Sequence, residues 1–265
     1  MRPLAVIGHV ARDVVGGGEP RIGGAPWYAG RAFRLLNRRA QIAAKCGEPE
    51  RRAFAARLAT LGLPVSLRTG GETTSFSLDY DGDRRRMGVG AVGEPWRPAE
   101  ALAAVGRAEW VHVGPLLRSD FPAATLAALA RGRRLLVDAQ GLVRVPKTGP
   151  LEFDREFDSE VLRHIAILKL AEEEAVALTG GIDGLEELGI PEIVVTLAGE
   201  GCAVITGGRL QHVPARAVDG VDDPTGAGDA FAATYIAARS DGHRPASAAR
   251  RATSLVSGLL AGRVR

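Results

Sequence analysis

Eight residues near the C-terminus combine the residue types that a phosphoryl transfer needs. Residues 222–229 are Asp-Asp-Pro-Thr-Gly-Ala-Gly-Asp, and an apolar stretch follows them directly. Pro224 fixes its own φ and favours an extended Asp223, while Gly226 and Gly228 permit backbone conformations that a side chain would forbid. A helix that begins near Asp229 leaves its first amides without intrahelical acceptors. Together with the helix dipole, these amides predict an anion site.

An aspartate beside an anion site repels the bound anion, so binding alone does not explain Asp229. The position becomes useful if Asp229 accepts a proton from an alcohol that then attacks a phosphoryl group. The structural alternative is an aspartate that caps a helix after a glycine turn, which a lone Gly-Ala-Gly-Asp string would favour.

The whole eight-residue string is more specific than its last four residues. It resembles the C-terminal signature of the ribokinase-like (PfkB) sugar kinases. The resemblance implies that Gly226, Ala227 and Gly228 form an anion hole with Asp229, that Asp229 is the catalytic base, and that Thr225 contacts the nucleotide.

A second glycine pair lies near the N-terminus, ahead of an apolar helical pattern. Gly23-Gly24 resembles the N-terminal signature of the same family, and Gly8 to Asp13 resembles its opening G-x-x-x-x-D. The resemblance implies that Asp13, Gly23, Gly24 and Tyr28 bind the substrate. Tyr28 stands where the family has an asparagine, which weakens an assignment to ribose. For Asp13, a surface turn is the structural alternative.

Two further segments resemble the donor side of the family. Thr196, Gly199 and Gly201 match its nucleotide-binding turn, and Glu174 matches the glutamate of its N-x-x-E element near Mg²⁺ and the phosphates. Ala171 replaces the asparagine of that element, so half of it is absent. The structural alternative is that the acids around Glu174 simply favour a helix N-terminus.

Other classes of enzyme fit the sequence poorly. Residues 141–148 imitate a Walker A loop, but Pro146 replaces its second glycine and cannot donate an N–H to a phosphate. Arg144 in this segment has either a place near the site or a plain surface role. The five histidines and two cysteines show no metal-ligand spacing, and no G-x-S-x-G elbow indicates a hydrolase.

The elements that position these residues alternate between short apolar runs and helical patterns, which predicts an α/β fold with a mainly parallel sheet. We expect strands at 4–8, 40–44, 110–113, 135–138, 165–169 and 193–197, and a hairpin of 202–206 and 209–213. We expect helices at 27–37, 48–61, 99–105, 122–131, 158–163, 172–179, 184–188, 229–238 and 246–260.

The pattern changes between about residues 65 and 90. Residues 73–80 alternate as a half-exposed strand, residues 81–83 form a turn, and residues 84–87 return. We therefore expect a small β insertion, which the family resemblance makes a lid over the substrate. The expected whole is a single domain over residues 1–265, a three-layer α/β/α sandwich with a small β lid.

The composition of the chain bears on its cellular location and on its possible partners. The chain has 265 residues, 46% hydrophobic and 25% charged, with a net charge of +3 and only two cysteines. No apolar run approaches the length of a membrane span, and the N-terminal run is short for a signal peptide, so we expect a cytoplasmic protein without a membrane partner. The scattered arginines lack aromatic interleaving, which argues against a nucleic-acid partner.

The function expected from the resemblance is ATP-dependent, Mg²⁺-assisted phosphorylation of a hydroxyl of a sugar or polyol. Two alternatives stay open: a nucleoside kinase on the same fold, and a binding or regulatory homologue with weak catalysis. The intact Asp229 argues against the regulatory homologue and Ala171 argues for it. A homodimer is compatible with the sequence, which does not identify the substrate.

Overall fold

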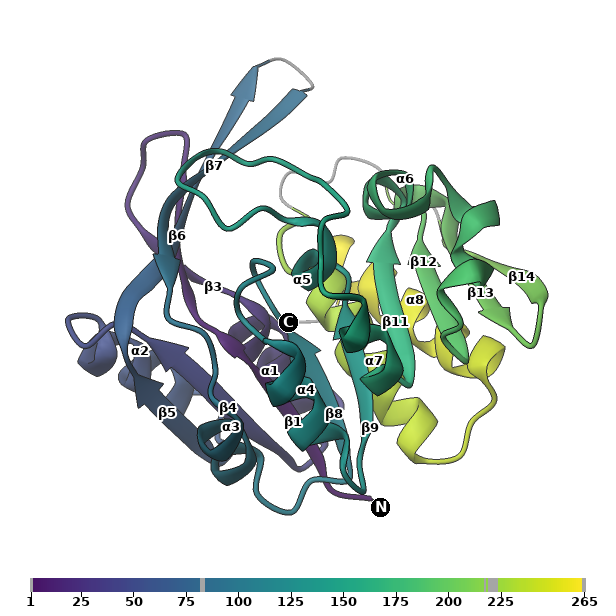
Figure 1. Cartoon of the computed structure of the whole chain (residues 1–265), viewed down its shortest axis with the longest axis horizontal. Coiled ribbons are helices and arrows are strands. Elements are labelled where there is room, and N and C mark those ends of the chain that lie inside the picture. The colour runs from purple at the N-terminus through teal and green to yellow at the C-terminus, as the bar shows by residue number, and fades with distance from the viewer. Residues whose placement is uncertain (1, 82–83, 217, 219–223, 264–265) are drawn as a thin grey trace.

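A computed structural model of the chain (Figure 1) describes residues 2–81, 84–216, 218 and 224–263. Asp222 and Asp223 of the C-terminal motif and the expected lid turn at Gly82 and Asp83 lie outside the described residues. Among the described residues, no helix combines the length and apolar character that crossing a bilayer requires.

A nine-stranded sheet forms the middle layer, in the order β14-β13-β12-β11-β9-β8-β1-β4-β5. Neighbouring strands are parallel except for the antiparallel pairs of β13 with β12 and β14. As expected, β13 and β14 form a hairpin joined by Gly207 and Gly208, which both have positive φ. The strands are β1 (Leu4–His9), β4 (Ala40–Cys46), β5 (Val65–Thr69), β8 (Trp110–Gly114), β9 (Arg134–Asp138), β11 (Ile167–Ala171), β12 (Glu192–Thr196), β13 (Gly201–Thr206) and β14 (Arg209–Pro214).

Helices cover both faces of this sheet because its strands are apolar on both sides. In β1, Leu4 and Val6 join the core beneath one helical layer, and Ala5 and Ile7 join the core beneath the other. The first layer consists of α1 (Ala25–Leu35), α2 (Arg51–Ala59), α7 (Ala227–Ser240) and α8 (Pro245–Leu260). The second consists of α3 (Pro98–Val105), α4 (Ala123–Ala130), α5 (Gln140–Val143) and α6 (Glu172–Thr179). The expected three-layer sandwich is confirmed.

The expected helices at 158–163 and 184–188 are 3₁₀ helices, Ser159–His164 and Ile182–Leu188. A third short 3₁₀ helix, Ala198–Glu200, connects β12 to β13. Short connections of this kind satisfy local backbone groups with i→i+3 hydrogen bonds and do not extend into regular helices.

A separate five-stranded sheet, in the order β10-β7-β6-β2-β3, forms the lid. Its strands are β2 (Ala11–Val15), β3 (Arg21–Gly23), β6 (Gly71–Asp81), β7 (Arg84–Gly93) and β10 (Gly149–Pro150). Figure 1 shows β6 and β7 projecting from the body as a long two-stranded ribbon.

The lid is larger than the insertion expected around residues 65–90. Residues 65–69 are instead β5 of the main sheet, and three lid strands lie outside the expected interval. The added strands are short and weakly alternating, and they exist because distant partners pair with them: Arg12 of β2 lies in register with Ser75 of β6. Such pairing leaves little local signal in the sequence.

Buried polar contacts tie the base of the lid to the main sheet. His9 Nε2 at the end of β1 lies 2.9 Å from the carbonyl oxygen of Glu94, just beyond β7. Lys45 Nζ on β4 donates to the carbonyl oxygen of Pro95, at 3.1 Å. These contacts fix the position from which the lid reaches over the ends of the parallel strands.

Candidate active site

A cavity of about 240 Å³ lies where the lid meets the carboxyl ends of the parallel strands and the N-terminus of α7. We call it the polar cavity. Its walls include Asp13 of β2, Lys169 of β11, Glu174 of α6 and Asp229 of α7. The carboxyl edge of a parallel sheet is the usual place for ligands in open α/β folds, because chain reversals there leave a crevice.

The loop before α7 combines a left-handed glycine with the start of a helix. Gly226 is the N-cap of α7 with φ +81°, a left-handed conformation that favours glycine. The amide of Ala227, however, donates to the carbonyl oxygen of Pro224 at 3.0 Å. The amides of Gly228 and Asp229 are the next in the first turn, where a helix offers no internal acceptor.

Both glycines of the loop sit against side chains that leave no room for a Cβ. A Cβ on Gly226 would overlap the ring of Tyr28, and a Cβ on Gly228 would lie 2.9 Å from Lys169 Nζ. The loop is therefore packed between an aromatic ring and a buried ammonium group. Gly228 therefore lies beside the positive charge of Lys169.

Asp229, itself half-buried, lies beside the buried side chains of His112, Asp138 and Lys169. Asp138 at the end of β9 accepts hydrogen bonds from Lys169 Nζ at 2.8 Å and lies 3.1 Å from His112 Nε2. Burial raises the pKa of Asp229 to about 6, and the charge of Asp138 adds to the rise. His112, Lys169 and Arg144 oppose it. Asp229 is thus an aspartate with the proton affinity that a general base near neutral pH needs.

Lys169 stays charged in the polar cavity because carboxylates surround it. Burial alone would lower the pKa of Lys169, but Asp138, Glu174 and Asp229 hold it above its usual value. Asp138 has the opposite balance: burial would raise its pKa, and Lys169 and His112 hold it down. Arg144 Nη2 adds a second cation, 3.9 Å from Glu174 Oε1.

Most of the predicted substrate residues lie on the polar cavity. Asp13, Gly24 and Tyr28 line it, together with Phe76 and Leu78 of the lid, and Asp13 is the register partner of Phe76 in the lid sheet. Gly23 stands behind Asp13: a Cβ there would overlap the Asp13 carboxylate. The first glycine of the pair therefore makes room for Asp13, and the second lies on the cavity wall.

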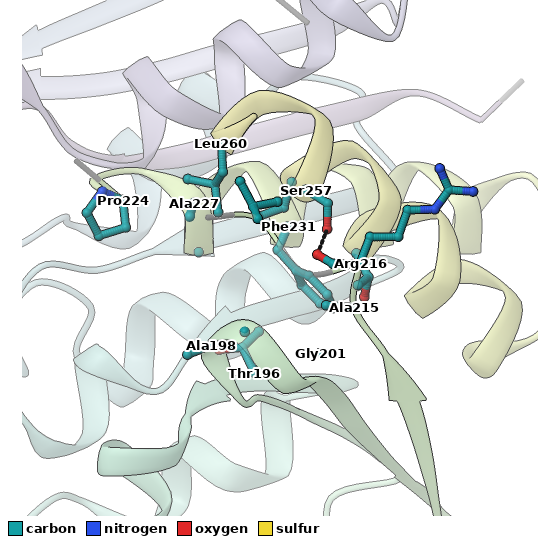
Figure 2. A pocket seen from close by; sticks show the side chains of 15 residues that line it. Thr196, Ala198, Gly201, Ala215, Arg216, Pro224, Ala227, Phe231, Ser257 and Leu260 are labelled. Carbon is teal, nitrogen blue, oxygen red and sulfur yellow. Dashed lines mark hydrogen bonds between the residues drawn. The ribbon is translucent and has the colours of Figure 1, made fainter. Parts of the chain in front are cut away.

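Residues predicted for the nucleotide line a second cavity of about 390 Å³ on the other side of the loop. We call it the apolar cavity. Figure 2 shows residues of α7 and α8, among them Phe231 and Leu260, on one side of it, and Thr196 and Gly201 on the other. Gly199 also lines it. Thr225 lines the polar cavity and not this one.

The two cavities meet at the loop. Thr196, Pro224 and Gly228 line both, and Asp229 lies on the polar side. A group held between the cavities would lie over the first turn of α7. This arrangement suits the transfer of an anionic group from a molecule in one cavity to a molecule in the other.

In the part of the chain that the structure describes, two places at the polar cavity could hold a metal ion: the cluster of His112, Asp138 and Asp229, and the carboxylate of Glu174. His112, Asp138 and Asp229 have ligand atoms within 4.8 Å of one another. Both oxygens of Asp138 already contact Lys169 and His112, so a cation there would compete with an ammonium group. Glu174 is fully buried at the cavity wall, and burial raises its pKa. Its Oε2 accepts from the Ala171 amide at 2.8 Å, which is the helix-capping role that the sequence left as the alternative.

The sequence reasoning placed Asp138 at the end of the sheet where ligands bind, but it assigned no site role to Asp138, His112 or Lys169. His112, Asp138 and Lys169 stand in otherwise apolar strands, and Lys169 is one of only three lysines in an arginine-rich chain. Charged residues at the carboxyl ends of neighbouring parallel strands meet at one edge, and this pattern could have identified them. Arg144, for which a surface role was an alternative, lines the polar cavity.

Comparison with known proteins identifies the family of the chain. The model of the pfkB family carbohydrate kinases matches residues 19–258. A pyrophosphate-dependent kinase in the ribokinase family, solved with a pyrophosphate analog and myo-inositol, is 27% identical, with a TM-score of 0.83 over 96% of this chain and 93% of that one.

Two more distant structures share the fold. Fructokinase from Vibrio cholerae, bound to fructose, ADP and calcium, is 22% identical, with a TM-score of 0.73 over 98% of this chain and 92% of that one. Ribokinase from Arabidopsis thaliana, bound to ribose and ATP, is 19% identical, with a TM-score of 0.71 over 97% and 91%. The chain belongs to the PfkB family and is a carbohydrate kinase of the ribokinase fold.

Proposed function

We propose that this PfkB-family kinase transfers the terminal phosphoryl group of ATP to a hydroxyl of a sugar or polyol, with Asp229 as the general base. One observation carries the proposal: the polar and apolar cavities share a wall at Thr196, Pro224 and Gly228, with Asp229 beside it. An acceptor alcohol in the polar cavity and a donor in the apolar cavity would then face each other across the first turn of α7.

The residues around the shared wall have separate tasks in this mechanism. Asp229 accepts the proton of the acceptor hydroxyl as its oxygen attacks the phosphorus. The first-turn amides of Gly228 and Asp229 and the ammonium of Lys169 stabilise the charge on the transferring group. The amide of Ala227 joins them only if it exchanges its bond to Pro224, so the predicted anion hole of Gly226, Ala227 and Gly228 stays a proposal.

The acceptor side favours a small molecule with hydroxyls and one less polar face. Asp13 and Tyr28 offer hydrogen-bonding groups, whereas Phe76, Leu78 and Met87 of the lid present apolar surface to the same cavity. A sugar or polyol has both kinds of face. The apolar lid surface also suits a purine or pyrimidine ring, so a nucleoside kinase remains the second candidate for the acceptor.

The apolar cavity supports ATP as the donor. Val218, Phe231, Val256 and Leu260 give it a surface suited to a flat heterocycle, and Thr196, Gly199 and Gly201 border it. Pyrophosphate needs no such surface and is the second candidate for the donor. The 27% identity to a pyrophosphate-dependent kinase favours it, as do the two cations Lys169 and Arg144 beside the loop.

Mg²⁺ fits the polar cavity at Glu174 better than at Asp138. Glu174 and its exposed neighbour Glu173 both line the cavity with carboxylate oxygens, the ligand type that Mg²⁺ prefers. Since one oxygen of Glu174 caps α6, we propose that Glu174 acts through water. The ion, when bound, would neutralise and orient the donor phosphates.

We treat residues 1–265 as one kinase domain with its lid. A binding or regulatory role without turnover is the least supported alternative, because Asp229 has both the position and the raised pKa of a base. An assay of phosphorylated product by ³¹P NMR, over sugars, polyols and nucleosides with ATP or pyrophosphate as donor, tests the proposal. A phosphate ester of a sugar or polyol formed from ATP is the expected result, and no ester with either donor would contradict the proposed activity.

A further inference from the structure

A third cavity, of about 670 Å³, lies outside the site just described, between the root of the lid and helices α1 and α2. Its walls come from β2 and β3 of the lid, from α1, from α2 and from Thr225 of the anion loop. None of the motifs that indicate the kinase activity requires it.

Four arginines line this arginine cavity: Arg12, Arg21, Arg31 and Arg57. They come from four different elements, so their convergence is a property of the fold and not of one basic run in the sequence. Glu50 is the acidic residue among the described residues of the lining, and its carboxylate accepts a hydrogen bond from Thr73 Oγ1 at 2.7 Å. Arg21 already takes part in an interaction of its own, so the positive charge available in the cavity is that of Arg12, Arg31 and Arg57.

The lining of the arginine cavity includes two aromatic side chains. Trp27 and Phe54 contribute rings, and Phe54 is buried. The Arg31 guanidinium lies 5.9 Å from the centre of the Trp27 ring, at a cation–π distance that preorients the side chain. Preoriented guanidinium groups bind phosphate oxygens through two parallel hydrogen bonds and lose little side-chain entropy in doing so.

The arginine cavity is mechanically connected to the active site. Arg12 and Asp13 are successive residues of β2, and successive side chains of a strand point to opposite faces. Arg12 lines the arginine cavity and Asp13 lines the polar cavity. Tyr28 and Thr225 line both cavities, and the ring of Tyr28 packs on Gly226 of the anion loop.

We propose that the arginine cavity is a second ligand site, which binds a small molecule carrying two or more phosphate groups. Arg12, Arg31 and Arg57 beside two aromatic rings fit such a polyanion better than a neutral sugar. A bound polyanion joins Arg12 of the lid to Arg31 and Arg57 of the helical layer. It thereby holds β2, and with it Asp13, in place on the body of the protein.

Binding of inorganic tripolyphosphate tests the site, with Trp27 as a local reporter. The chain has three tryptophans, and the other two, Trp96 and Trp110, are buried elsewhere in the core. Tripolyphosphate is therefore titrated into the wild-type protein and into the Trp27→Phe variant. The fluorescence change that is present in the wild type and absent from the variant comes from Trp27 and reports binding in the arginine cavity. At about 0.15 M salt we expect a saturable Trp27-dependent change.

Reversing the charge of two arginines tests whether tripolyphosphate binds in the arginine cavity. Arg31→Glu combined with Arg57→Glu should weaken the Trp27-reported binding at least tenfold. Arg52→Glu is the matched control, because Arg52 is exposed on the same helix as Arg57 and does not line the cavity. It should change the affinity less than twofold. Equal weakening by both variants would mean a diffuse positive field and would overturn the site.

Two further outcomes would also overturn the proposal. One is the absence of any Trp27-dependent signal in the wild-type protein up to millimolar tripolyphosphate. The other is tighter binding of a single-stranded oligonucleotide than of tripolyphosphate, with the same dependence on Arg31 and Arg57, because the ligand would then be a nucleic acid. Slower amide exchange in β2 and β3 with tripolyphosphate bound is the expected sign of the link to Asp13.

Discussion

The polar and apolar cavities meet at one loop but are built in different ways. The polar cavity, about 240 Å³, collects charged residues from the ends of parallel strands and from the lid. The apolar cavity, about 390 Å³, is formed mainly by α7, α8 and the β12–β13 connection. The contrast indicates a division of labour: the polar cavity provides the groups that react, and the apolar cavity provides the shape that selects the donor.

The two cavities also differ in their electrostatic cost. Lys169, Asp138 and Glu174 are buried and Asp229 is half-buried, and the charges of these neighbours shift one another's pKa values. The apolar cavity contains no comparable cluster among the described residues of its lining. Changes on the polar side should therefore alter the rate, and changes on the apolar side should alter donor affinity.

The largest effect should come from Asp229→Asn. Loss of a general base typically costs ~10²–10⁴ in rate, so kcat should fall by that factor while donor binding, measured by calorimetry, is retained. The same variant should melt ~2 °C or more higher, because the raised pKa shows that the folded state disfavours the ionised carboxylate. A kcat near that of the wild type would show that Asp229 is not the general base.

Gly228→Val should be the next most damaging change. The new Cβ would crowd Lys169 Nζ at the wall that both cavities share, and the branched side chain would cover the first-turn amides. Loss of comparable anion stabilisation costs ~10²–10³ in kcat. Enzyme kinetics and melting temperature measured together decide the cause: a large loss of stability with unchanged kcat/KM would mean that the glycine serves packing only.

Val256→Trp tests whether the nucleotide occupies the apolar cavity. The larger ring would fill the cavity that we assign to the nucleotide base, so KM for ATP should rise about tenfold, the equivalent of 1.4 kcal/mol of binding. Turnover with pyrophosphate, if the enzyme accepts it, should change little. Ser254→Trp, on the exposed side of the same helix, is the control. An unchanged KM for ATP would argue that the donor does not occupy this cavity.

Asp13→Ala and Tyr28→Asn should affect the acceptor and not the donor. An unpaired buried hydrogen-bonding group costs about 1–3 kcal/mol, so Asp13→Ala should raise KM for the acceptor roughly tenfold with little change in KM for ATP. Tyr28→Asn exchanges a flat ring for an amide and should shift preference among sugars, polyols and nucleosides. The substrate profile of Tyr28→Asn checks this, and an unaltered profile would contradict the placement of Tyr28 at the acceptor.

The sequence predicted the main sheet and its helices well because their signals are local. Apolar runs such as 110–113 and the two glycines at 207–208 determine a buried strand and a hairpin without reference to the rest of the chain. The α7 start and Asp229 were found because residues 224–229 carry a proline, two glycines and an aspartate at fixed spacing.

What the sequence did not reveal depends on contacts between distant residues. β2 joined the lid through pairing with β6, some 60 residues away, and β3 joined it through pairing with β2. Neither strand has a strong alternation of its own. Lys169 and Asp138 are 31 residues apart and become an ion pair only when β9 and β11 align. The sequence also does not reveal the hydrogen bond from the Ala227 amide to the Pro224 carbonyl oxygen. This hydrogen bond removes one amide from the set expected to bind the anion.

The pH dependence of kcat/KM for the acceptor tests the central claim most directly, because it needs no substitution and reports the proton on the base. The base must be ionised to accept a proton, and burial raises the pKa of Asp229 to about 6. Activity should therefore be full well above pH 6 and should fall tenfold per pH unit below it, with an apparent pKa near 6 for either donor. A kcat/KM that stays flat down to pH 5, in an enzyme that remains folded there, would contradict the account.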